Sequence, residues 1–154
     1  MQIIRVSIPF LFFISLIVYA EEQELIHAKE SRIVSLEEAK LSQGDYGFFK
    51  IHTRGETAMT VKSFSGICTV HPGKAVHPEH RHAEEEYLVI MEGEGTWTLD
   101  GVESPAKKGD VLYVEPWVFH GLTNTGAEDL LFFVVKYHPK DTPLPLEPKG
   151  SHGR

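Results

Sequence analysis

Short strand-like runs make up most of this chain from about Phe48 onward, and they limit what it can fold into. The runs are rich in Val, Ile, Phe, Tyr and Thr, and clusters of Gly, Pro, Asn and Asp separate them. Asp100-Gly101 is a strong signal for a tight hairpin turn. No apolar periodicity at helical spacing runs through this region. The pattern therefore predicts an all-β sandwich or barrel over residues 44–138.

The N-terminal segment differs from the rest of the chain. Residues 1–20 carry Arg5 as their only charged side chain, then an apolar run that ends in Val18-Tyr19-Ala20. Small residues at this exit predict a secretory signal that is cleaved after Ala20. An uncleaved membrane anchor is the alternative, although a span needs about 20 apolar residues and this run is shorter. We therefore expect a secreted or periplasmic protein with no stable membrane insertion after cleavage.

A polar leader and a proline-rich tail flank the predicted barrel. In the leader, residues 21–43, Ser35 followed by Glu38 fits a capping box, and Gly44 fits a helix stop. This predicts one short helix there or, failing that, an extended segment. The tail, residues 139–154, holds four of the nine prolines, so it cannot continue a sheet and is expected to be flexible.

The charge balance and the cysteine content exclude two further possibilities. The net charge is −7, from 15 basic and 22 acidic residues, whereas a nucleic-acid binder needs a basic surface to neutralise phosphates. Cys68 is the only cysteine, so an intramolecular disulfide cannot form. Its position in a strand-like run predicts a small buried core residue.

The stretch HPEHRHAEEEYLVIMEGEG, residues 77–95, concentrates side chains that bind metals. Residues two apart on a strand face the same side, so His80, His82 and Glu86 would present two imidazoles and a carboxylate together. His120, which follows a later strand-like run, is the best candidate for a further ligand. Such a set suits a divalent transition metal (Fe, Mn, Zn, Ni or Cu), whereas a closed structural zinc site usually needs several thiolates. A solvated charged face is the alternative.

The spacing of these residues resembles the two sequence motifs of the cupins, which are small double-stranded β-helix or jelly-roll barrels. The first motif, G(X)5HXH(X)3–4E(X)6G, is matched at His80, His82, Glu86 and Gly93. The second motif, G(X)5PXG(X)2H(X)3N, is matched at Gly109, His120 and Asn124. The first glycine of the first motif, at Gly73, sits one residue early. The resemblance covers residues 66–137.

This resemblance implies a site and a range of functions. In the family, the matching residues hold the metal, which here implies His80, His82, Glu86 and His120. Glu84 and Glu85 are weaker candidates than Glu86, because only Glu86 leaves the six-residue gap to Gly93. The implied function is a metal-dependent enzyme on a small molecule, of the dioxygenase, isomerase or lyase type; the alternative is a cupin that binds a sugar or metabolite without turnover. A homodimer is expected, and no residue is singled out as catalytic.

Several side chains near the motifs stay unassigned from the sequence alone. Trp117 stands where the second motif has its inner glycine, and a positive φ there would be costly for Trp. It could wall the pocket, contact a dimer partner or simply pack against neighbouring residues. His77 is a candidate for lining the mouth or relaying a proton. His52, Arg54 and Lys136 lie in predicted outer strands, where one of them could contact an anionic substrate.

Overall fold

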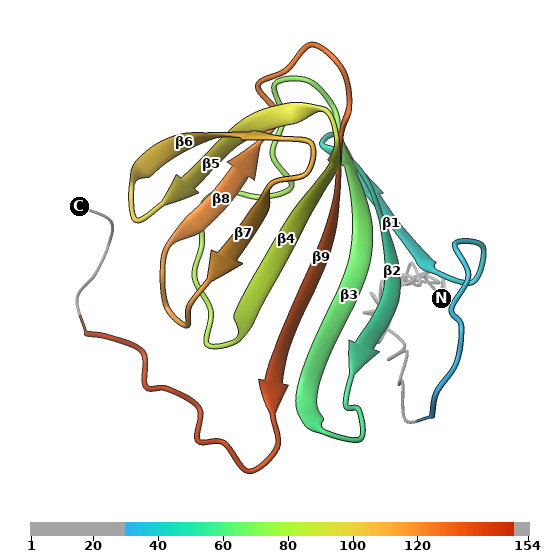
Figure 1. The fold of residues 1–154 in the computed structure, drawn as a ribbon, viewed down its shortest axis with the longest axis vertical. Coiled ribbons are helices and arrows are strands. Elements are labelled where there is room, and N and C mark those ends of the chain that lie inside the picture. Colours follow the sequence, from blue (N-terminus) through green and yellow to red (C-terminus); the bar gives the residue numbers. More distant parts are fainter. Residues whose placement is uncertain (1–29, 150–154) are drawn as a thin grey trace, which may run out of the picture.

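The computed structural model describes residues 30–149, and every regular element in that range is a β-strand. The strands are β1 (Lys40–Gly44), β2 (Gly47–Gly55), β3 (Thr60–Val70), β4 (Glu85–Glu92), β5 (Glu94–Leu99), β6 (Val102–Lys107), β7 (Val111–Val114), β8 (His120–Thr123) and β9 (Leu130–Pro139). They form two antiparallel sheets, with strand orders β1-β2-β3-β9-β4-β7 and β6-β5-β8 (Figure 1). The all-β prediction is confirmed.

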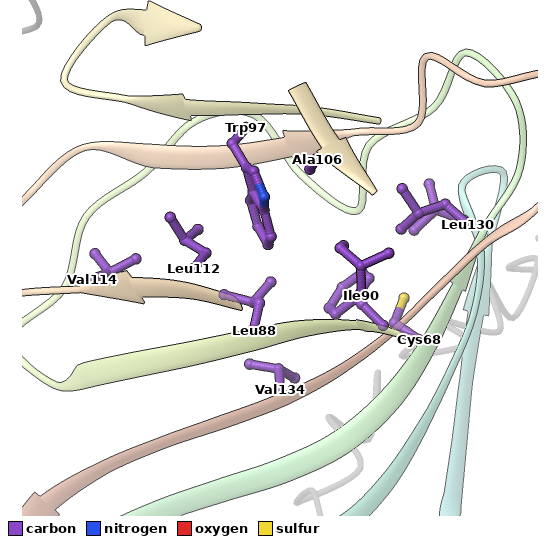
Figure 2. Close-up of a cluster of buried hydrophobic side chains, with 11 residues drawn as sticks. Cys68, Leu88, Ile90, Trp97, Ala106, Leu112, Val114, Leu130 and Val134 are labelled. Carbon is purple, nitrogen blue, oxygen red and sulfur yellow. The ribbon is translucent and has the colours of Figure 1, made fainter. Parts of the chain in front are cut away.

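The hydrophobic core lies between the two sheets. Alternate residues of β4 point inward, so Leu88 and Ile90 are buried while Tyr87 is exposed. Figure 2 shows the indole of Trp97, from the smaller sheet, pointing toward Leu88 of the larger sheet. Cys68 belongs to the same cluster and is fully buried, which confirms its prediction as a core residue.

Two turns form where the sequence demands unusual backbone angles. Asp100 and Gly101 have φ values of 50° and 78° and connect β5 to β6, as the hairpin signal predicts. Gly93, between β4 and β5, has a φ of 78°, and a Cβ there would lie 2.7 Å from the carbonyl oxygen of Asp129. Only glycine therefore fits at Gly93, both for its φ and for its close approach to the neighbouring backbone.

The leader contains no helix in the part that the structure describes. The capping box does form: the Ser35 amide donates to Glu38 Oε2 at 3.0 Å, and the Glu38 amide donates to Ser35 Oγ at 3.3 Å. However, the helical alternative is wrong, because the chain makes a single turn and enters β1 at Lys40, which pairs with Ile51. One turn does not offset the cost of helix nucleation, whereas the strand gains a full ladder of hydrogen bonds.

Two further predictions concern the ends of the chain. The predicted signal, residues 1–20, lies outside the described residues. Within residues 30–149, no helix is long and apolar enough to cross a membrane. The described part of the tail, residues 140–149, has no regular secondary structure. The first residues of the tail nevertheless contact the barrel, because His138 Nε2 donates to the Thr142 carbonyl at 2.8 Å.

Candidate metal centre and its cavity

Three histidines, His80, His82 and His120, lie close together, and two of them, His80 and His120, line the cavity between the sheets. A pair of backbone hydrogen bonds joins His80 to His120: the His80 amide donates to the His120 carbonyl at 3.0 Å, and the reverse bond measures 2.9 Å. Their ring centroids lie 4.4 Å apart, and the His82 ring lies 5.0 Å from that of His120. One potential ligand atom from each histidine lies within 4.8 Å of the other two. This spacing allows all three imidazoles to reach one ion.

Hydrogen bonds to backbone carbonyls orient two of these rings. His82 Nδ1 lies 2.9 Å from the Glu84 carbonyl oxygen, and His120 Nδ1 lies 2.8 Å from the Val118 carbonyl oxygen. A carbonyl oxygen can only accept, so each Nδ1 carries the proton. In the neutral ring of His120 this leaves the Nε2 lone pair free to bind a metal, the usual arrangement for ligating histidines, whereas Nε2 of His82 lies 3.0 Å from Glu86 Oε2.

The cluster leaves buried nitrogens without protein partners. Among the described residues, His120 Nε2 and His80 Nδ1 are buried and have no hydrogen-bond partner. Such orphaned groups are costly unless a ligand satisfies them. Burial, followed by electrostatic interaction with the neighbouring imidazoles of His77 and then His120, lowers the pKa of His80 to about 4, and burial also lowers the pKa of His120. Both imidazoles are therefore neutral near pH 7, the form that coordinates metals, and the donor set fits a divalent transition ion.

Glu86 places a buried carboxylate against this cluster. Its Oε2 lies 3.0 Å from His82 Nε2, and its Oε1 lies 3.7 Å from His120 Nε2. Burial raises the pKa of this carboxyl, but the hydrogen bond with His82 and the charge of Lys136 outweigh it and leave the pKa below its usual value. The carboxylate is therefore ionised at neutral pH and can serve as a fourth ligand.

The local structure that produces the cluster differs from the one expected. The parity rule for strands does not apply to His80 and His82, because β4 begins only at Glu85 and both histidines lie in the loop before it. A loop can supply the same two side chains because the backbone bridge to His120 fixes its course. Glu86 is the first inward-facing residue of β4 and lies beside the cluster, as the motif spacing implies.

The remaining acidic and histidine candidates have other partners. Glu84 pairs with Lys62 at 3.2 Å, and Glu85 accepts hydrogen bonds from Tyr113 and Tyr137. His71, which lies before the motif, forms a hydrogen bond with Asp129, with 2.9 Å between Nδ1 and Oδ1. None of these three side chains lines the cavity. By contrast, His77 lines the cavity, and its ring centroid lies 4.0 Å from that of His80.

A cavity of about 280 Å³ lies next to the cluster. Its walls are mainly apolar, and they include aromatic rings of β2, β3 and β9. Its histidine and charged side chains are His77, His80, His120, Glu86, Arg54 and Lys136. A concave, mainly apolar cavity with a few convergent polar groups is typical of small-molecule sites. The sequence alone does not place Arg54 and Lys136 in this cavity, because the register between strands decides which side chains face inward.

Trp117 adopts the positive φ of the glycine that it replaces. Its φ is 67°, and the Val118 amide reaches back to the Glu115 carbonyl at 3.4 Å. With Pro116 at the second position, this is the pattern of a type II turn, whose third residue is normally glycine. The Trp117 amide donates to the His82 carbonyl at 2.7 Å, which ties the turn to the metal-site loop.

The Trp117 side chain packs against the C-terminal tail and does not line the cavity. Its Nε1 donates to the Pro145 carbonyl at 2.8 Å. Nearby, Arg81 pairs with Glu147 at 2.7 Å and lies over the Phe119 ring, with 4.8 Å from Cζ to the centroid. The structure shows contact of Trp117 with the tail and not a position in the cavity wall; contact with a dimer partner stays a prediction.

Comparison with known proteins places this arrangement in a family. The Cupin domain family matches residues 66–136. The chain is 36% identical over 58 residues to gentisate 1,2-dioxygenase of a Streptomyces species, 36% over 64 residues to the oxalate-binding protein of Thermotoga maritima, and 39% over 67 residues to dimethylsulfoniopropionate lyase of Ruegeria pomeroyi. These matches span 37%, 42% and 44% of this chain, but only 16%, 53% and 43% of the respective relatives.

Solved structures show the same fold over most of the chain. An RmlC-like cupin from Shewanella frigidimarina superposes with a TM-score of 0.59 at 16% identity, covering 73% of this chain and 96% of that one. A predicted oxalate decarboxylase from Thermotoga maritima superposes with a TM-score of 0.56 at 24% identity, covering 70% and 99%. The predicted jelly-roll barrel is thus confirmed. Residues 66–136 thus match the Cupin domain, the described chain shares the fold of solved cupins, and together these findings support a small cupin superfamily protein.

Proposed function

We propose that the cluster binds one divalent transition metal ion through His80, His82 and His120, with Glu86 as the fourth group. The observation that carries this proposal is His120 Nε2, a buried nitrogen with no partner among the described residues, beside an Nδ1 that donates to Val118. A side chain held in this way is oriented for a ligand on its other nitrogen. The clustering of two further imidazoles and a carboxylate around the same point supports an ion of charge +2.

We propose that the protein is a metal-dependent enzyme on a small molecule, of the dioxygenase, isomerase or lyase type. A bound ion would supply Lewis-acid chemistry or, if it is iron, oxygen chemistry. The mainly apolar walls provide contact surface for the body of a substrate, and Glu86 holds a negative charge next to the three histidines. His77 lines the cavity yet is exposed, so it can move a proton between the cavity and solvent. A dioxygenase and a lyase among the relatives support an enzyme.

The second candidate is a protein that binds a small molecule without turnover. It is supported by the relative that is named an oxalate-binding protein, which has the same level of identity as the dioxygenase. Metal and ligand binding are common to both functions. An enzyme consumes the bound small molecule, and this turnover should stop in the Glu86→Gln variant and in metal-free protein. A binding protein leaves the small molecule unchanged in all of these forms.

Elemental analysis of protein purified without an affinity tag tests the metal site. Wild type should carry about one equivalent of a divalent transition metal, whereas the double variant His80→Ala/His120→Ala should carry almost none, because two of three imidazoles are gone. His71→Ala is the matched control, since His71 is a histidine bonded to Asp129 outside the cavity. Equal metal content in the double variant and in wild type would show that the site is misassigned. Iron would favour oxygen chemistry, and zinc, manganese or nickel would favour Lewis-acid chemistry.

We also propose that the protein is secreted or periplasmic and that it forms a homodimer. The composition of residues 1–20 supports export, and an N-terminus at Glu21 in the mature protein would test it. The dimer is supported by the open edge strand β7, where Val111 and Tyr113 are exposed large side chains next to Tyr87 of β4. Sedimentation of wild type and Val111→Glu would test it, since a dimer through this edge should dissociate in the variant.

A further inference from the structure

One wall of the cavity carries a row of charged side chains that the metal site does not explain. Strand register aligns Arg54 of β2 with Phe64 of β3, Phe64 with Lys136 of β9, and Lys136 with Glu86 of β4. All four residues line the cavity. Two cations therefore lie in the same cross-strand row as the candidate metal ligand Glu86, on the inner face of the barrel.

Arg54 faces inward because of an irregularity in β2. Ile51 is buried and lines the cavity, and in a regular strand a residue three positions later would face the opposite side. The register between β2 and β3 shifts between Ile51 and Thr53, which reverses the alternation and turns Arg54 inward. Bulges of this kind commonly redirect a side chain beside a functional site.

The positive charge in this row exceeds the negative charge that faces it. Lys136 Nζ lies 4.0 Å from Glu86 Oε2, at the limit of an ion pair, and Arg54 has no acidic partner among the described residues. Both cations lie over the Phe64 ring, with 5.2 Å from Arg54 Cζ and 5.7 Å from Lys136 Nζ to its centroid. The ring orients the cations but does not neutralise them. In a chain of net charge −7, two such cations on an inner wall point to an anionic ligand.

We propose that the cavity binds a small organic carboxylate, with its carboxylate group held by Arg54 and Lys136 and its other end directed toward the three histidines. The planar guanidinium of Arg54 matches a carboxylate in geometry, and Lys136 adds a second positive charge. Phe64 and Phe49, whose rings meet edge to face at 5.4 Å, provide an apolar surface for the body of the molecule. The volume of about 280 Å³ restricts the ligand to a small molecule. This inference rests on the proposed function for the orientation of the ligand toward the metal.

Calorimetric titration of the purified protein with benzoate, and with its neutral counterpart benzamide, tests the carboxylate site. Benzoate should bind at one site, and benzamide at least about tenfold more weakly, because it forms no charged pair. Arg54→Gln and Lys136→Met should each weaken benzoate binding about tenfold or more. Lys50→Met, which removes a cation of β2 outside the cavity, should bind like wild type. Arg54→Lys keeps the positive charge and should bind benzoate better than Arg54→Gln does. This comparison distinguishes the loss of the charge from a folding defect at this position.

Three results would overturn the carboxylate site: equal affinity for benzoate and benzamide, wild-type affinity in the Arg54→Gln/Lys136→Met double variant, or binding of inorganic phosphate but not benzoate. Metal content, measured on the same preparations, keeps the two proposals apart. Benzoate binding that depends on Arg54, in a protein that holds no metal, would support the carboxylate site and refute the metal site. Stoichiometric metal in wild type, with benzoate binding that does not depend on Arg54 and Lys136, would support the metal site and refute the carboxylate site.

Discussion

The turn at Trp117 makes a sharp prediction about the sign of a stability change. Trp117 has a φ of 67°, a left-handed conformation that costs a residue with a Cβ about 1–2 kcal/mol relative to glycine. Trp117→Ala and Trp117→Gly both remove the indole and its hydrogen bond to Pro145, so these losses cancel when the two variants are compared. What remains is the backbone cost. Trp117→Gly should therefore be more stable than Trp117→Ala by about 1 kcal/mol.

Chemical denaturation with a linear extrapolation measures this difference directly. In thermal unfolding, the glycine variant should melt about 4 °C above the alanine variant. Val102 provides the control, because it is an exposed strand residue with no positive φ. There the order should reverse, with Val102→Ala about 0.5–1 kcal/mol more stable than Val102→Gly. If alanine is the more stable replacement at Trp117 as well, the left-handed turn and the cost assigned to it are wrong.

Two further predictions concern the buried groups around the site. The pKa of His80 is about 4 in the folded protein, against an ordinary value of 6.5. As the pH falls, the unfolded state therefore binds a proton at this residue before the folded state does. In metal-free protein, kept so by a chelator, the free energy of unfolding should fall as the pH drops from 6.5 toward 4. His80→Gln should show a shallower fall in denaturation measured across this range; an unchanged slope would contradict the low pKa. Asn124 is fully buried, and its amide donates to the Val70 and Glu128 carbonyls at 2.7 and 2.8 Å. Asn124→Ala should lower the free energy of unfolding by about 3 kcal/mol, whereas a loss under 1 kcal/mol would mean that water replaces the amide.

The sequence predicts the structure correctly where the relevant signal is local. Alternating apolar residues and Asp100-Gly101 predict strands and a hairpin because strand faces and turn angles depend on neighbouring residues. The candidate ligands were found by the resemblance to a family motif, which supplied the distant partner, His120. The helix expected from Ser35 and Glu38 failed for the opposite reason. Its local signal is present and its hydrogen bonds form, but pairing of β1 with β2 determines the structure.

By itself, then, the sequence determined the fold class, the single buried thiol and the candidate ligands His80, His82, Glu86 and His120. Tertiary structure alone decided what surrounds them. The bridge between His80 and His120 orders a loop that has no strand of its own, and a register shift in β2 turns Arg54 into the cavity. These features depend on contacts between segments far apart in the chain. Neither pairing register nor the free energy that holds Trp117 at a positive φ can be read from neighbouring residues.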